Sequence, residues 1–373
     1  MDLYSLPTPC LVLDIDRVKR NIARINDRVR SLGARLRPHV KTHKCVELAR
    51  LQTAGHSGSL TVSTLAEARV FAANGFPDIT YAVPIEPGKF NAAVEIIQKG
   101  VRLSLITDDP AIPPLLNEAA GRAGVKIPLL LEVDCGYHRT GVEPRSLEAL
   151  ATIRSIVDSK HLLFEGLLTH AGHSYHCVSR EEVLAIARIE RDSTVGYAEE
   201  LRAKGIPVPV VSIGSTPTIT HVDHLAGIDE VRPGNYIFFD AFQASLGSCG
   251  FDDCALTVLA SVVHCDAVRR KVAIDAGAIA LSKDQGAVDL DPLCGYGVVC
   301  SLEGKDVGLR VHSVSQEHGL VPVEDDGLFC RLKVGERLRI AVNHSCLAAA
   351  QHDHYNVLEG GEIVAQWQIH RGW

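Results

Sequence analysis

The segment RLRPHVKTHK places two lysines and two histidines directly after a short apolar run. A neutral lysine amine is a nucleophile that can attack an aldehyde, and nearby positive charges favour this neutral form. Lys41 directly follows the apolar run, with Arg37, His39 and His43 as its sequence neighbours. Lys44 lies further on, where exposure to solvent is expected. The segment predicts either a reactive amine at Lys41 or an ordinary solvated basic turn.

A second candidate group is the pair His344 and Cys346 in the segment VNHSC. Side chains two positions apart on an extended segment project to the same side, and imidazole and thiolate are both zinc ligands. Spacing alone is weak evidence, because catalytic zinc usually has three protein ligands. The HDH run at 352–354 is an alternative metal site or, on the simpler interpretation, a polar turn.

Two glycine-containing loops could bind an anion. Gly214, Ser215 and Thr216 open the run GSTPT, and Gly234 and Asn235 lie in GNY. Backbone N–H groups and a hydroxyl in such loops can bind phosphate, although both runs could also be ordinary turns. A phosphate site together with a reactive lysine indicates a phosphorylated carbonyl cofactor, and pyridoxal phosphate has both requirements.

The elements that must position these residues are short apolar runs alternating with amphipathic helical patterns. Repeated βα units predict parallel strands and a (β/α)8 barrel, whose functional groups lie just beyond the C-terminal ends of the strands. The barrel has eight strands and there are nine runs, so the first run is expected to lie elsewhere. The nine runs are 10–15, 36–40, 59–63, 79–84, 101–106, 127–134, 164–170, 208–214 and 231–240.

Three further polar residues follow these predicted strands. Arg139 comes after 127–134, and His170 and Tyr175 come at and after the end of 164–170. Polar residues also end strands for solubility alone, so the prediction depends on their convergence on one rim of the barrel.

The pattern changes after about residue 245, where strand-like runs alternate with turn residues and little helix. This pattern is typical of a mostly β domain. The predicted domains are therefore a barrel over 16–245 and a β domain over 246–373 that also includes residues 1–15.

Composition excludes several function classes. The 373 residues are 46% hydrophobic and 22% charged, and the formal net charge of −7 gives no reason to expect nucleic acid or an anionic membrane as partner. No apolar run reaches transmembrane length, and the first ten residues lack a signal-peptide pattern. Eleven cysteines without a paired framework indicate reduced thiols and a cytoplasmic protein.

A set of motifs occurs in order along the chain: RPHVKTHK, THAGHSY, VSIGSTPT, VRPGNYIFFD, IDAG, GYG, QEHG and NHSC. In these motifs the chain resembles the D-serine dehydratase-like family of alanine-racemase-like (fold type III) pyridoxal phosphate enzymes. The resemblance covers essentially the whole chain and is strongest to the D-threo-3-hydroxyaspartate and D-serine dehydratase branch. It implies an α/β fold with a cofactor-binding (β/α)8 barrel and a second, mostly β domain that the opening strand joins.

The resemblance also implies roles for individual residues. Lys41 is implied to form a Schiff base with the cofactor, and Arg139 to lie near the cofactor's phenolic oxygen. The remaining residues implied to hold or adjoin the cofactor are His170, Tyr175, Gly214, Ser215, Thr216, Gly234, Asn235 and Tyr236.

The same resemblance implies a metal and a reaction. Dehydratases of this family carry histidine and cysteine as zinc ligands where aldolases carry histidine and aspartate, so His344 and Cys346 favour a zinc- or other divalent-metal-dependent dehydratase. Such an enzyme converts a D-3-hydroxy amino acid, D-serine or D-threo-3-hydroxyaspartate, to a 2-oxo acid and ammonia. Retro-aldol cleavage, racemisation and non-catalytic cofactor binding are the alternatives. Family members imply a homodimer with shared active sites, and Gln316 and His318 could line the substrate pocket or form a loop.

Overall fold

The computed structural model describes residues 2–373, which divide into two compact units. We call the part made of Ile25–Lys41, Leu48–Gly234 and Arg371–Trp373 the barrel unit. The β unit consists of the chain up to Arg24 together with Thr42–Glu47 and Asn235–His370.

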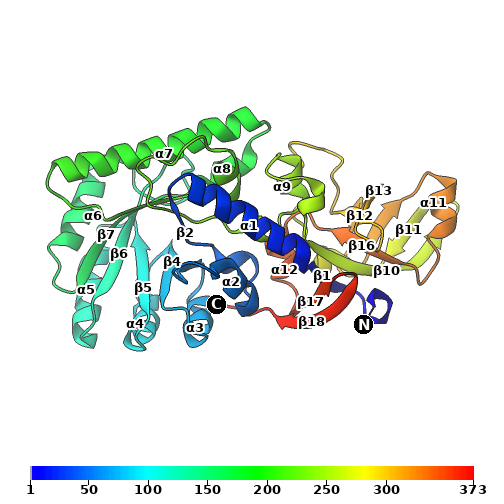
Figure 1. The fold of residues 1–373 in the computed structure, drawn as a ribbon, viewed down its shortest axis with the longest axis horizontal. Helices are drawn as coiled ribbons and strands as arrows, with labels where there is room; N and C mark the ends of the chain where they lie inside the picture. Colours follow the sequence, from blue (N-terminus) through cyan, green and yellow to red (C-terminus); the bar gives the residue numbers. More distant parts are fainter. Residues whose placement is uncertain (1) are drawn as a thin grey trace. The chain divides into compact units, whose positions relative to one another are not determined.

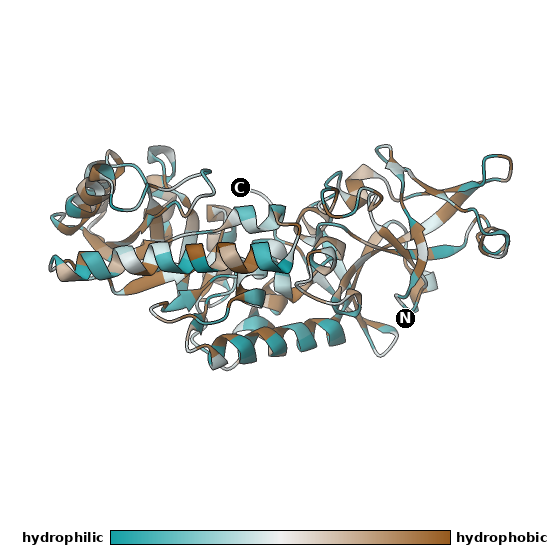
Figure 2. Cartoon of the chain, turned by 90° about the horizontal axis from the view of Figure 1, so that it is seen from above, coloured by the Kyte–Doolittle hydropathy of each residue, from teal (hydrophilic) through white to brown (hydrophobic). Residues whose placement is uncertain are grey.

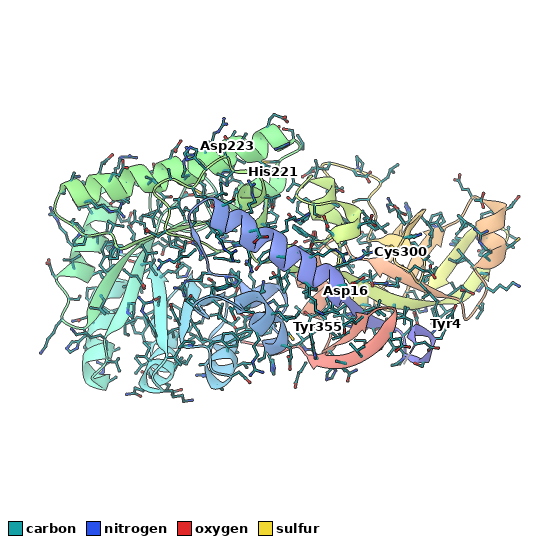
Figure 3. All side chains as sticks on the ribbon, viewed as in Figure 1. Tyr4, Asp16, His221, Asp223, Cys300 and Tyr355 are labelled. Atoms are coloured by element: carbon teal, nitrogen blue, oxygen red, sulfur yellow. The ribbon has the colours of Figure 1, made fainter. Side chains whose placement is uncertain are left out.

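These units differ from the predicted domain bounds in four places, at residues 16–24, 42–47, 235–245 and 371–373. Side-chain contacts explain the first two. The first half of helix α1 (Ile15–Ser31) belongs to the β unit, where Asn21 donates to the carbonyl oxygens of Ile237 at 3.3 Å and Asp253 at 2.8 Å. The segment Thr42–Glu47 is held there as well, because the hydroxyl of Tyr355 (labelled in Figure 3) donates to the carbonyl oxygen of His43 at 2.8 Å. Which bounds separate the functional domains stays a prediction.

The barrel unit contains an eight-stranded parallel sheet with the strand order β2-β9-β8-β7-β6-β5-β4-β3 (Figure 1). An isolated parallel bridge between His39 and Thr61 joins the chain after β2 to β3 and closes the sheet on itself. The sheet is therefore the predicted (β/α)8 barrel. Its strands are β2 (Arg35–Leu36), β3 (Leu60–Val62), β4 (Asp78–Pro84), β5 (Arg102–Thr107), β6 (Ile127–Glu132), β7 (Leu162–Leu168), β8 (Val210–Ile213) and β9 (Glu230–Val231).

The barrel strands are buried on both faces because helices surround them. All six residues of β6, IPLLLE, are buried, as parallel strands between layers require. The helices carry hydrophobic and hydrophilic residues along their length, as α7 shows in Figure 2. They are α2 (Val46–Thr53), α3 (Leu65–Ala73), α4 (Phe90–Gln98), α5 (Ile112–Ala123), α6 (Leu147–Val157), α7 (Arg180–Ala203) and α8 (Thr216–His221).

Two predicted strands are much shorter than expected, and the run 36–40 forms only the two-residue strand Arg35–Leu36. The run 231–240 is extended only at Glu230–Val231, and the chain then turns into a 3-10 helix at Asn235–Ile237. Pro233 has no N–H to donate, but its carbonyl oxygen accepts from the backbone of His39 at 3.0 Å. Strand pairing therefore ends where the chain leaves the barrel.

The β unit is built on a ten-stranded sheet with the path β13-β12-β16-β10-β1-β17-β18, to which β11, β14 and β15 attach. Strand β1 (Cys10–Asp14) pairs antiparallel with β10 and parallel with β17, so the first apolar run is indeed outside the barrel. The other strands are β10 (Leu256–Asp266), β11 (Lys271–Ile274), β12 (Val298–Cys300), β13 (Asp306–Arg310), β14 (Ser313–Val314), β15 (Gly319–Pro322), β16 (Arg337–Ala341), β17 (His354–Glu359) and β18 (Glu362–Gln368). The helices are α9 (Ala241–Ser245), α10 (Ala278–Leu281), α11 (Asp326–Arg331) and α12 (Ser345–Ala349).

Among the described residues, no helix combines the length and the apolar character needed to cross a bilayer.

Candidate active site

Lys41 lies beyond the C-terminal end of strand β2, in a short 3-10 helix (Val40–Thr42). Its side chain is half-buried, and its backbone N–H donates to Nδ1 of His39 at 3.5 Å. Lys44 is half-buried too, so exposure does not separate the two lysines as the sequence predicted. The backbone separates them: Lys44 has a left-handed φ of 50°, and its carbonyl oxygen accepts from His370 at 2.7 Å.

Arg37 does not act as the predicted cationic neighbour of Lys41. Its guanidinium is buried and donates to Glu230 at 2.9 Å and to Asp78 at 3.0 Å. Burial opposes its charge, but the two carboxylates outweigh burial and raise the pKa of Arg37. Its charge is therefore neutralised inside the barrel.

His170 follows β7 and is electrically neutral. Burial, followed by the positive charges of Lys41 and Arg139, lowers the pKa of His170 to about 3. Its Nδ1 lies 3.2 Å from the carbonyl oxygen of Gly214, which can only accept a hydrogen bond. Nδ1 therefore carries the hydrogen, and Nε2 keeps a lone pair. Lys41, Arg139 and His170 thus share one end of the barrel.

Arg139 is exposed, and an aromatic cluster holds it. Its guanidinium carbon lies 5.3 Å from the ring centroid of Tyr137, which stacks on His173 at 5.9 Å and meets the edge of His170 at 6.4 Å. Gly172 makes room for this ring, because a Cβ there would lie 2.2 Å from Tyr137. Tyr137 and His173 were not predicted from the sequence, although each lies within three residues of a predicted site residue.

The loop after β8 is fixed by a buried carboxylate on α7 that the sequence did not reveal. One oxygen of Glu190 accepts from the backbone of Ala171 at 2.9 Å and from Gly214 at 3.1 Å. Burial raises the pKa of Glu190. Gly214 has a left-handed φ of +119°, which favours glycine at this turn. Glu190 therefore joins the loop after β7 to the loop after β8.

The other predicted residues of this rim lie in the same two loops. Ser215 caps α8, and its hydroxyl lies 3.0 Å from that of Ser174. Thr216 is buried at the first position of α8, and Tyr175 is half-buried in the 3-10 helix Gly172–His176. Together with Gly214 and His170, these residues form one continuous group after β7 and β8.

Glu132 is a further buried carboxyl group, at the end of β6. One of its oxygens accepts from Thr140 at 3.0 Å, and the other has no hydrogen-bond partner. Burial raises the pKa of Glu132 to about 7, which the charges of Arg139 and Arg232 only partly oppose. Glu132 was not predicted from the sequence, in which it is simply the last polar residue of an apolar strand.

In the β unit, Asp240 ties Asn235 to the chain around Cys346. Its Oδ2 accepts from Nδ2 of Asn235 at 2.6 Å and from the backbone of Ser345 at 2.9 Å. The same Nδ2 lies 3.7 Å from the sulfur of Cys346, and Oδ1 of Asn235 is buried without a partner. Tyr236, next in the chain, is fully buried.

His344 and Cys346 meet, but not on the extended segment that was predicted. Helix α12 begins at Ser345, and the two side chains hydrogen bond to one another across its first turn. Burial disfavours both charges, yet Asp284 and Cys346 raise the pKa of His344 to about 11, and His344 lowers the pKa of Cys346. The imidazolium form of His344 and the thiolate form of Cys346 therefore favour one another.

The thiol of Cys346 also connects this pair to the segment that carries Lys41. Its sulfur lies 3.3 Å from the hydroxyl of Thr42, the residue directly after Lys41 in the chain. Within residues 2–373, no group of three or more histidine, cysteine, aspartate and glutamate side chains could hold a metal, so the HDH run forms no such site. His352 of that run instead contacts the carbonyl oxygen of Ala280 at 3.0 Å.

Gln316 and His318 are exposed at the tip of the hairpin between β14 and β15. The backbone of Ser315 donates to His318 at 2.8 Å, and the tip packs on Gly277, where a Cβ would lie 2.5 Å from the carbonyl oxygen of Gln316. None of these contacts involves His344 or Cys346, and a substrate role for the two residues stays a prediction.

Comparison with known families matches both parts of the chain. The alanine racemase N-terminal domain matches residues 13–241, and the serine dehydratase domain matches residues 255–358. Among characterised relatives, D-threo-3-hydroxyaspartate dehydratase of Delftia sp. is 39% identical over 100% of this chain and 99% of its own length. D-serine dehydratase of Dictyostelium discoideum is 33% identical (100% and 98%), and 3-hydroxy-D-aspartate aldolase of Paracoccus denitrificans is 28% identical (99% and 93%).

Solved structures agree. The Delftia dehydratase superimposes with a TM-score of 0.96 at 40% identity over 100% of both chains. Structures of D-threo-3-hydroxyaspartate dehydratase have also been solved as a cysteine-to-alanine mutant in a metal-free form and as a histidine-to-alanine mutant. The fold and the matched families define an alanine-racemase-like pyridoxal phosphate enzyme. More narrowly, the chain belongs to the D-serine dehydratase-like family.

Proposed function

We propose that this protein is a pyridoxal phosphate- and zinc-dependent dehydratase. It eliminates water from a D-3-hydroxy amino acid, D-serine or D-threo-3-hydroxyaspartate, and yields a 2-oxo acid and ammonia. The observation that carries the proposal is the hydrogen-bonded pair of His344 and Cys346, whose cysteine contacts the residue directly after Lys41. Relatives named as dehydratases are also more similar to the chain than those named as aldolases, at 39% and 33% against 28% identity.

The residues at the barrel rim fit pyridoxal phosphate. Lys41 offers an amine beyond a strand end, and Asn235 offers a buried oxygen with no partner in the protein. The residues proposed to hold the cofactor are Lys41, Arg139, His170, Tyr175, Gly214, Ser215, Thr216, Gly234, Asn235 and Tyr236. When bound, the cofactor supplies an aldehyde that holds the substrate's amino group and a ring that withdraws electrons from the α-carbon.

Lys41 is the proposed general base for the α-proton. Its amine lies beyond the end of β2, and His170 at the same end of the barrel is neutral and adds no positive charge there. A base that is held at the strand end can take the proton from one face of the substrate only. A fixed base would act on one enantiomer of the substrate, and the names of the relatives support the D-form.

His344 and Cys346 are the proposed zinc ligands, because imidazole and thiolate together suit zinc. Support comes from the mutant structures of D-threo-3-hydroxyaspartate dehydratase, whose exchanged histidine and cysteine lie two residues apart, as His344 and Cys346 do here. Zinc, when bound, supplies a Lewis acid for the β-hydroxyl, which is otherwise a poor leaving group. With two protein ligands, the chain leaves coordination positions for water and substrate.

Product analysis distinguishes this function from its alternatives. Incubation with D- and L-forms of serine, threonine and 3-hydroxyaspartate should give 2-oxo acid and ammonia from a D-substrate. Glycine as the main product would instead establish an aldolase, and inversion of the α-carbon alone would establish a racemase. Cofactor binding without any turnover would support a non-catalytic protein.

The metal's role is tested by Cys346→Ala. We expect the variant to keep its bound cofactor but to lose at least about 100-fold in turnover, because a Lewis acid contributes several kcal/mol to such a step. Cys330→Ala, at an exposed cysteine of α11, is the matched control and should turn over normally. Full turnover by Cys346→Ala after chelation would contradict the zinc-assisted step.

We also propose a cytoplasmic homodimer. All eleven cysteines are free thiols in the structure, which supports a reducing compartment. The dimer is the family expectation, and the mass in solution should be about twice 40.3 kDa.

A further inference from the structure

Asp284 contacts the histidine of the proposed metal pair. Its Oδ2 lies 2.6 Å from Nδ1 of His344, and both side chains are about one-third exposed. Histidines that bind metals characteristically donate the hydrogen on their other ring nitrogen to an oxygen atom, and this partner fixes the orientation of the ring. Asp284 lies in a loop that no sequence motif marked, sixty positions before His344.

We propose that Asp284 positions His344 in the proposed zinc site, on which this inference rests. Asp284 holds Nδ1–H of His344 so that Nε2 binds the metal. A carboxylate accepts hydrogen bonds only, so the hydrogen of the metal-binding ring must be on Nδ1. A metal binds the nitrogen that carries no hydrogen. The contact therefore fixes the ring orientation before the metal arrives and keeps the hydrogen on Nδ1 when Nε2 loses its own to bind the metal.

The loop around Asp284 is built to hold this carboxylate in place. Oδ1 accepts from the backbone of Gly286 at 2.9 Å, and the backbone N–H of Asp284 donates to the hydroxyl of Ser282 at 3.1 Å. Gly286 has a φ of +63°, and a Cβ there would lie 3.0 Å from Cβ of Phe242. The backbone of Phe242 donates in turn to Asn343 at 3.3 Å, directly before His344. The same helix, α9, thus supports both Asp284 and His344.

Charge gives Asp284 a second effect. A zinc ion bound by one thiolate and one neutral imidazole keeps a single positive charge, which the carboxylate of Asp284 balances through the ring. Asp240 has a different role, because it accepts from the backbone of Ser345 at 2.9 Å and so fixes the chain beside Cys346. With two protein ligands instead of three, the orientation of each contributes more to affinity.

The test is metal affinity, measured on the full chain without substrate. Co²⁺ is titrated into metal-free protein, and the thiolate-to-cobalt absorbance of Cys346 reports binding. We expect Asp284→Asn to bind about 10–100-fold more weakly with an unchanged band shape, and Asp284→Glu to recover part of the loss. Asp266→Asn, a turn carboxylate paired with Arg269, is the control and should bind like the wild type.

The outcomes separate this inference from the function on which it rests. Binding by Asp284→Asn within about twofold of the wild type would overturn the positioning role and leave the metal site intact. A wild type without a thiolate band would overturn the zinc site itself and the inference with it. A measurement that needs no variant is ¹⁵N NMR of the zinc-loaded wild type: the metal on Nε2 of His344 supports the inference, and the metal on Nδ1 overturns it.

Discussion

Lys41 and Lys44 have the same side chain but lie in different backbone conformations. Lys41 ends the chain that follows β2, whereas Lys44 sits in a left-handed turn whose carbonyl oxygen accepts from His370. The functional groups of a (β/α)8 barrel lie beyond the C-terminal ends of its strands, which is where Lys41 lies. Chemistry at this segment therefore belongs to Lys41 in our proposal.

Exchange of each lysine for alanine tests this assignment. We expect Lys41→Ala to lose the visible absorbance of covalently bound cofactor and at least about 100-fold in turnover, since it removes both the attachment and the base. Lys44→Ala keeps the backbone contact and should keep both properties. Absorbance spectra and initial rates decide the matter, and the opposite pattern would show that the reactive amine is Lys44.

Glu132 predicts a pH dependence of stability. The pKa of this carboxyl is raised from 4.5 to about 7, so the folded protein binds its proton more tightly than the unfolded chain does. This contribution is fully present below pH 4.5 and is lost as the pH rises through about 7. The loss amounts to at most about 3.5 kcal/mol, because one pKa unit corresponds to about 1.4 kcal/mol.

Glu132→Gln removes this titration. Urea unfolding should give the variant a higher free energy of unfolding than the wild type at pH 8, and a much smaller difference at pH 4. An equal difference at both pH values would show that Glu132 does not titrate in this range.

At the scale of elements, the barrel depends on close contact between β7 and β8. Gly166 in β7 has a φ of +137°, and a Cβ there would lie 1.9 Å from the carbonyl oxygen of Val210 in β8. No side chain could relieve this overlap, because both partners are backbone. The strand ends that carry His170 and Gly214 are joined through this contact.

Gly166→Ala should therefore lower the free energy of unfolding by more than about 3 kcal/mol, the range of severe packing changes. Gly205→Ala is the matched control, since Gly205 has a similar positive φ of +77° but nothing within 4 Å of its Cβ. It should cost about 1 kcal/mol, from backbone strain alone. Equal losses in thermal or urea unfolding would contradict the argument from close contact.

At the scale of the whole molecule, the contact between Cys346 and Thr42 bears on which subunit of a dimer provides each part of the proposed site. Both residues belong to one compact unit of one chain, and Thr42 directly follows Lys41. We expect the proposed amine and metal pair to come from the same subunit. Shared active sites in a dimer would draw other residues from the partner.

Mixing two inactive variants tests this arrangement. Lys41→Ala and Cys346→Ala subunits that exchange into mixed dimers should remain inactive, because each proposed site lacks one group. If the metal pair served the neighbouring subunit, random mixing would restore about a quarter of wild-type turnover, since half the dimers would contain one intact site. Recovery of that size would contradict the same-chain arrangement.

The sequence was sufficient for the strands and for the residues that carry distinctive chemistry. Buried parallel strands are apolar along their whole length, so the run IPLLLE predicted β6, and all six of its residues are buried. The short run after Val231 was not predictable as a turn, because its end depends on pairing with the chain at His39. Local pattern predicts what a segment prefers, and distant pairing determines where it stops.

The amino-acid order by itself determined the alternation of strands and helices, the amine at position 41 and the histidine–cysteine spacing, because each is a property of a short segment. Only the tertiary structure decided which carboxylates act on these groups. Asp284 reaches His344 across sixty positions, and Glu190 joins two loops from a helix between them. Hydrogen bonds form between atoms a few ångströms apart in space, and separation along the chain does not determine that distance.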